Sequence, residues 1–115
     1  MMPAVAEVEK IFKTKTGGVP FDSDSIQETI AMLVLAQAIE KAQSLDPEVV
    51  AKTLYANTWP SPLSLSGKVA FAPGGQNKLA LSIVTQLQGG SYKRIFPTEK
   101  ADTKPIFPMK PWDKR

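Results

Sequence analysis

The sequence predicts a mixed α/β fold in which three helices precede two or three short strands and an extended, proline-rich tail. Apolar residues recur at helical spacing through the first half of the chain and stand between glycine turns in the second half. Ten prolines, most of them beyond residue 59, exclude a helix near the carboxyl end. With 115 residues, of which 43% are hydrophobic and 22% charged, the chain has the size of one domain or less and a globular composition.

A first helix is expected over residues 3–16. Val5, Val8, Ile11 and Phe12 recur at helical spacing on one side of such a helix, and charged residues lie on the other. Gly17 and Gly18 follow and supply the left-handed conformation with which many helices end. The sequence therefore predicts an amphipathic helix that packs one face against the rest of the chain.

The second helix is the most unusual predicted element. Ser25 and Glu28 have the spacing of a capping box, so the helix is expected to begin there and to run to about Gln43. Its centre, residues 30–36, is apolar on all sides. A helix of this kind is normally covered by protein all round, and the apolar window over residues 30–39, ten residues interrupted by Gln37, is too short to span a bilayer. We expect it to lie between two layers, or between a sheet and another chain.

A third helix is predicted from Asp46, Pro47 and the residues after them. Aspartate at the cap followed by proline at the first helical position is a strong start signal, and the helix is expected to end near Ala56. Residues 57–66 then read as an irregular stretch, and residues 68–71 as a short strand.

The second half of the chain predicts a hairpin and a tail. Residues 79–87 alternate in part and predict a strand, residues 88–91 a tight turn, and residues 92–96 the returning strand. Everything after Pro97 is expected to be extended. Because two or three strands cannot cover an apolar helix on both sides, the sequence predicts that more protein surrounds this chain.

The composition excludes several kinds of chemistry. The chain has no cysteine and no histidine, which removes Ser-His-Asp and cysteine nucleophiles and the common zinc sites. No catalytic residue, metal ligand or cofactor-binding residue is predicted, and an enzyme is the least supported class of function. The net charge of +3 is too small to indicate nucleic acid. Pro73-Gly74-Gly75 lacks the lysine and following helix of a phosphate-binding loop.

The first ten residues do not resemble a signal peptide, because acidic residues occur at once and no basic start precedes an apolar run. A chain expressed as given is therefore expected in the cytoplasm.

Four segments carry a family resemblance when they are taken in order. They are residues 31–42, residues 44–54, the pattern Gly67-x-Val69-x-Phe71 leading to Gly75-Gln76-Asn77, and residues 104–112. Together they resemble the C-terminal third of bacterial solute-binding proteins of the branched-chain amino acid ABC transporter type, which have the type I periplasmic-binding-protein fold. The resemblance extends over nearly the whole chain.

The resemblance implies a two-lobed periplasmic receptor that binds an amino acid or a similar small polar solute in its cleft and delivers it to a membrane permease. Residues 1–60 would be the helical part of the first-lobe segment, residues 61–97 the strand and hairpin crossover region, and residues 98–115 the C-terminal tail. Most of the ligand site would lie outside this chain. The start of the second helix lies beside the cleft in the family, which makes Ser25 and Gln27 the candidate ligand contacts.

Two functions therefore follow from the sequence. The first is the C-terminal part of a solute-binding receptor, which lacks most of the ligand site and has no cofactor. The alternative is a free-standing interaction protein that forms a homo-oligomer through its apolar helix, residues 26–39.

Overall fold

The structure, a computed structural model, describes residues 3–109 and 111–114. It contains three α-helices and two antiparallel two-stranded sheets, so the predicted mixed α/β class and the order of helices before the hairpin are confirmed. The chain divides into two compact units, Met1–Ala80 and Leu81–Arg115. This division falls inside the region 61–97 that the sequence analysis treats as one crossover segment.

Helix α1 (Pro3–Thr16) has the predicted bounds. Gly17 and Gly18 end it with φ angles of 71° and 99°, and the Gly18 N–H donates to the Lys13 carbonyl at 2.9 Å. The Phe12 ring lies 5.1 Å from the Phe21 ring, centroid to centroid, in a tilted arrangement. This contact joins α1 to the segment that leads into the next helix.

Helix α2 (Ser23–Ala42) begins before the predicted start. The predicted capping box is wrong: Asp22 is the N-cap, and its Oδ1 accepts the backbone N–H of Ser25 at 2.9 Å. Asp22 stands three residues before Ser25, so its carboxylate meets the exposed N–H groups of the first turn and extends the helix upstream. The helix ends as predicted, at Gln43 in the left-handed conformation with φ 49°. No helix in the described part of the chain is long and apolar enough to span a membrane.

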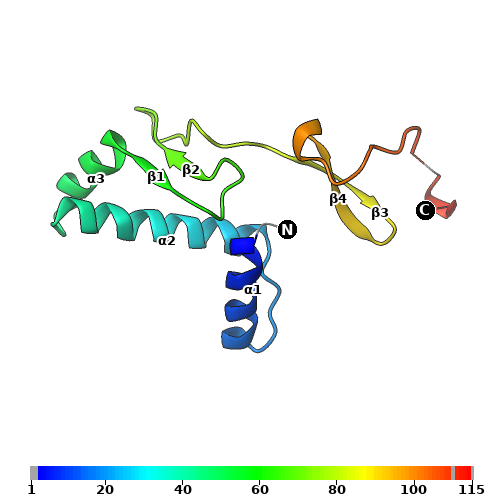
Figure 1. The fold of residues 1–115 in the computed structure, drawn as a ribbon, viewed down its shortest axis with the longest axis horizontal. Coiled ribbons are helices and arrows are strands. Elements are labelled where there is room, and N and C mark those ends of the chain that lie inside the picture. Colours follow the sequence, from blue (N-terminus) through cyan, green and yellow to red (C-terminus); the bar gives the residue numbers. More distant parts are fainter. Residues whose placement is uncertain (1–2, 110, 115) are drawn as a thin grey trace. The chain divides into compact units, whose positions relative to one another are not determined.

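Helix α3 (Pro47–Ala56) starts and ends as predicted, with Asp46 Oδ1 accepting the N–H groups of Glu48 and Val49 at 2.9 and 3.1 Å. Strand β1 (Thr58–Pro60) follows and pairs antiparallel with β2 (Lys68–Ala70). The prediction of an irregular stretch over residues 57–66 is wrong at β1, because Trp59 is buried and is held opposite Val69. Along α2 lie α3 and the β1–β2 pair (Figure 1).

Two small clusters of buried side chains form the core of residues 1–80. The larger cluster joins α2, α3 and the β1–β2 pair, and its buried members are Val34, Ala38, Val50, Trp59 and Val69. The smaller cluster joins α1 to the start of α2, and its buried members are Val5, Phe21 and Leu63. Only one side of α2 therefore faces a core, and its two buried residues are Val34 and Ala38.

The second unit is a hairpin of β3 (Val84–Gln88) and β4 (Ser91–Phe96). Gly89 and Gly90 make the predicted turn with φ angles of 58° and 77°, as a type I′ turn requires. The predicted strand over residues 79–87 is wrong in its first half. Asn77 holds the residues after it in a turn, since its carbonyl accepts the Ala80 N–H at 3.2 Å and its side chain accepts the Leu79 N–H at 3.1 Å.

The tail is less extended than predicted, because it contains the short 3₁₀ helices η1 (Thr98–Lys100) and η2 (Trp112–Lys114). It also returns to the hairpin. Asp102 bonds to Arg94 of β4, and the backbone of Ile106 bonds to the side chain of Gln86 in β3.

Candidate functional site

The structure places the two candidate ligand contacts, Ser25 and Gln27, in the first turns of α2 but does not bring them together. Ser25 is half-buried; its N–H donates to Asp22, and its carbonyl accepts the Thr29 hydroxyl at 2.7 Å. Gln27 is exposed. Residues two apart on a helix do not share a face, so the side chains of Ser25 and Gln27 cannot bind one small ligand between them.

The N-terminus of α2 has a hydrogen-bond acceptor in the chain itself, the carboxylate of Asp22. The backbone N–H of Ser25, and then the Ser25 side chain, donate hydrogen bonds to the Asp22 carboxylate and lower its pKa from its ordinary value of 3.8. A carboxylate at this end also complements the helix dipole. The helix start is therefore a capped end rather than a free anion-binding end.

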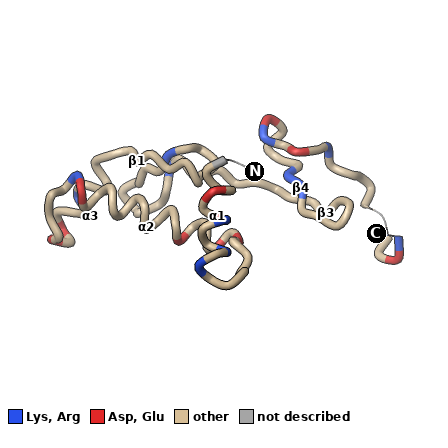
Figure 2. The backbone as a smooth tube through the Cα atoms, turned by 60° about the horizontal axis from the view of Figure 1, so that its bottom comes forward, with Lys and Arg blue, Asp and Glu red and all other residues tan. Residues whose placement is uncertain are grey.

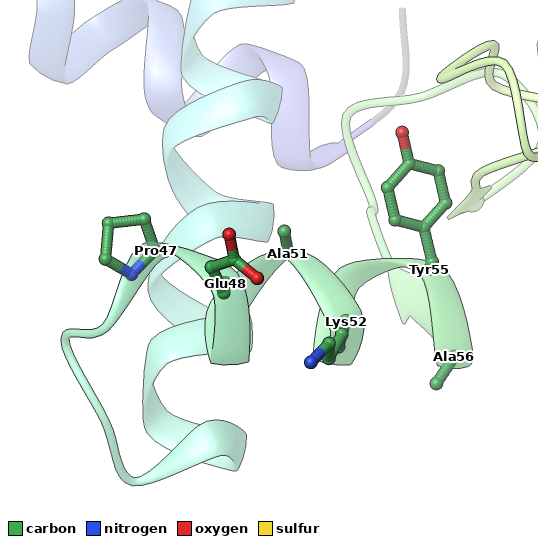
Figure 3. A pocket seen from close by; sticks show the side chains of 6 residues that line it. All are labelled: Pro47, Glu48, Ala51, Lys52, Tyr55 and Ala56. Carbon is green, nitrogen blue, oxygen red and sulfur yellow. The ribbon is translucent and has the colours of Figure 1, made fainter.

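A shallow groove runs along the outer side of α3 (Figure 3). Its lining residues are Pro47, Glu48, Ala51, Lys52, Tyr55 and Ala56. The Tyr55 ring meets the Phe71 ring edge-on at 6.2 Å, centroid to centroid, and a Cβ added to Gly75 would lie 3.5 Å from the Tyr55 hydroxyl oxygen. One helix and its side chains form most of this groove, so it offers a surface to a partner rather than an enclosure for a small solute.

The most extensive feature is the side of α2 that turns away from the core. Met32, Leu33 and Leu35 are 66%, 46% and 38% exposed, and Ala36 is exposed beside them. At 3.6 residues per turn these four residues cover the side opposite Val34, and we call them the open face of α2. In Figure 2 the middle of α2 is tan throughout, because residues 29–39 carry no charged side chain.

The described residues form no metal cluster and leave no buried polar side-chain atom unpaired. No group of three or more Asp and Glu side chains in this part of the chain is placed to hold a metal ion. Every buried side-chain nitrogen or oxygen in the described residues has a hydrogen-bond partner. The described core therefore contains no polar group without a hydrogen-bond partner. The exposed residues of the open face of α2 are apolar.

No family model matches the chain.

Sequence reasoning anticipated the apolar centre of α2 but missed two local features. One is Asp22 as the cap, although its place three residues before Ser25 and just after an apolar residue is itself a cap signal. The other is the groove on α3, whose lining residues all belong to that helix. Tyr55 in this lining also contacts the ring of Phe71, and a contact between residues so far apart in sequence leaves no local signal.

Proposed function

We propose that this chain is the C-terminal part of a two-lobed solute-binding receptor that serves ABC-transporter uptake of amino acids or similar small polar solutes. The remainder of the receptor supplies most of the ligand site and covers the apolar surface of this part.

The open face of α2 is the observation that carries the proposal. An uncharged helix with a core on one side and exposed Met32, Leu33 and Leu35 on the other is typical of a helix that lies between two layers of protein. The order of the four resembling segments indicates which kind of protein supplies the second layer. In a receptor lobe, helices of this kind lie against a sheet, and here the sheet would come from the remainder of the lobe.

The division of the chain supports the same proposal. The first unit ends at Ala80, and residues 81–83 lead to the hairpin without helix or strand. A chain that passes from one lobe of a receptor to the other has to contain such a connection. The second unit has no buried side chain in its described residues, which is typical of a segment that completes a larger sheet.

The proposal also assigns the remaining parts of the site. Gln27 is the better of the two candidate ligand contacts, because its amide is exposed whereas Ser25 is engaged with Asp22 and Thr29. The receptor would work in the periplasm and would deliver its solute to a membrane permease. No cofactor takes part.

The DNA on the 5′ side of the Met1 codon tests the proposal directly. We expect the same reading frame to continue upstream through a leader and the remaining parts of both lobes. An in-frame stop codon shortly before Met1, in several independent isolates of the gene, would contradict a receptor of full length.

Calorimetry and light scattering separate the proposal from its alternative. The 115-residue chain alone should show no micromolar binding of leucine, other amino acids or their amides, because most of the ligand site is elsewhere. Micromolar binding by a clean monomer would overturn the proposal. A cooperatively folded dimer or larger oligomer held through residues 26–39 would instead favour the free-standing interaction protein.

A further inference from the structure

The two edges of the β3–β4 hairpin differ, because the edge on β4 is blocked at Arg94. The Arg94 N–H donates to Asp102 Oδ2 at 3.0 Å, and the Asp102 N–H donates to the Arg94 carbonyl at 2.9 Å. The guanidinium adds bonds of 3.1 and 2.7 Å to the two carboxylate oxygens. Lys93 stands next to this clamp. Blocked backbone groups and charged side chains are the usual protection of a natural sheet edge.

The edge on β3 is open. The backbone N–H and C=O of Arg94 point away from β3. In an antiparallel pair, the register partner Thr85 therefore points its own N–H and C=O away from β4. Leu87, two residues later in β3, does the same. Among the residues that the structure describes, no hydrogen bond reaches these outward groups. The strand Val84–Gln88 also contains no charged residue and no proline, and the register shift of the hairpin lies at its start, between Val84 and Thr85.

The tail contacts β3 without using this edge. Gln86 Nε2 donates to the Ile106 carbonyl at 3.0 Å, and its Oε1 accepts the Ile106 N–H at 2.8 Å. Gln88 Nε2 donates to the Lys104 carbonyl at 3.0 Å. These bonds are made by side chains, which stand roughly perpendicular to the sheet. The backbone donors and acceptors of Thr85 and Leu87 therefore remain for another strand.

We propose that β3 pairs with β3 of a second copy of this chain, antiparallel and about a two-fold axis at Gln86. Thr85 then lies opposite Leu87 of the second copy, and Leu87 opposite Thr85, so that the outward groups on each edge meet their counterparts. The result is a four-stranded sheet in place of two isolated hairpins, each of which is marginal in water.

A second copy fits this edge because the strand is complementary to itself. The outward residues Thr85 and Leu87 stand on either side of Gln86. The contact between the two β3 strands, called the seam, brings no like charges together. The Lys93 side chains of the two copies would be separated by about three strand spacings, or about 14 Å, which is beyond the screening length at physiological salt. Leu87, 61% exposed, would lie diagonally across the contact from Leu87 of the second copy, with its register partner Tyr92, 77% exposed, beside it on the same face.

Sedimentation velocity on the 115-residue chain tests this pairing through two matched lysine variants. Leu87→Lys places a charge on the seam, whereas Tyr92→Lys places the same charge on the same face one strand away from it. We expect the unmodified chain to dimerise with increasing concentration. Leu87→Lys should weaken the dimer by about tenfold or more, and Tyr92→Lys by less than about threefold. The amide signals of Arg94 and Asp102 report that the hairpin is intact in each variant.

The position of the contact is read from amide chemical shifts during dilution. The proposal expects changes that centre on residues 84–88 and spare residues 32–36. A chain that stays monomeric to millimolar concentration overturns the pairing, and so does a dimer that responds equally to the two variants. Shift changes that centre on residues 32–36 would assign the dimer to α2 instead. None of these outcomes alters the reading-frame test, so the pairing and the proposed function fail separately.

Discussion

The two units of this chain are stabilised in different ways. Residues 1–80 bury side chains from α1, α2, α3, β1 and β2 in two apolar clusters. The described residues of 81–115 bury no side chain, and they are held by backbone pairing, an ion pair and the amides of two glutamines. Apolar burial is the main favourable term in folding, whereas an exposed ion pair contributes little. The first unit should therefore carry nearly all of the stability of the chain.

The two units also differ in what they leave exposed. The first unit has a core on one side of α2 and exposes apolar residues on the other. The second unit has no core on either side, so it is an element that needs a sheet or a partner strand. The following experiments test this difference between the two units.

Among the substitutions that bury no charge, the largest expected effect is that of Trp59→Ala. Trp59 is 3% exposed, packs in the larger cluster, and donates its indole N–H to the Leu54 carbonyl at 3.1 Å. Its loss should destabilise the first unit by about 3–5 kcal/mol, which is comparable to the whole stability of a small domain. Urea unfolding followed by circular dichroism measures the change in helix stability.

Trp112→Ala is the matched control, because Trp112 is 84% exposed and belongs to the second unit. It should leave the helical transition where it is. Equal effects of the two tryptophan variants would contradict the assignment of stability to the first unit.

Element positions were predictable from the sequence where local chemistry decides them. The stop at Gly17, the start at Asp46 and the turn at Gly89 each depend on backbone or cap preferences of a few neighbouring residues. The first half of the strand predicted over residues 79–87 was not predictable, because the Asn77 side chain competes with strand pairing there. Alternating apolar residues gave no sign of that competition.

The site was predictable only in part, for a related reason. The uncharged run along α2 is a property of consecutive residues. Its exposed face could be predicted because the other predicted helices and strands are too few to cover the helix on all sides. The clamp between Arg94 and Asp102 and the contact between the Tyr55 and Phe71 rings depend on the path of the chain between distant residues. Periodicity carries no information on such contacts.

A smaller effect is expected for Asp46→Ala, which removes the cap of α3. The two hydrogen bonds that Asp46 Oδ1 accepts from Glu48 and Val49 should be worth about 1 kcal/mol of helix stability. The same urea titration measures this loss. Asp46→Ser keeps an acceptor at the cap and should recover most of it, whereas a serine variant as unstable as the alanine variant would show that the cap is not the cause.

Acid should weaken the second unit through the protonation of Asp102. The side-chain hydrogen bond from Arg94, with its backbone bond, lowers the pKa of Asp102 from 3.8 to about 2. A carboxyl whose pKa is lower in the folded chain stabilises the fold above its unfolded pKa. The contribution of Asp102 is thus complete above about pH 4 to 5 and is lost as the pH falls through about 2.

A carboxyl carbon titration by NMR measures this pKa, with Asp102→Asn to assign the signal. The hairpin amides of Arg94 and Lys93 should shift over the same acid range, and the α2 amides beyond the first turn, which Asp22 caps, should not follow them. A midpoint for Asp102 near its ordinary value would contradict a formed clamp in solution.

The smallest effect is expected at the open face of α2. Met32→Lys replaces a 66% exposed side chain that contacts no core cluster, so it should change the unfolding free energy of the chain by less than about 0.5 kcal/mol. Val34→Lys, two residues along the same helix but 4% exposed, should prevent folding of the first unit because it buries an unpaired charge. A loss of more than about 2 kcal/mol in Met32→Lys would mean that another surface already covers this face in solution. With a small loss instead, the exposed methionine is free to meet the missing layer that the proposed function requires.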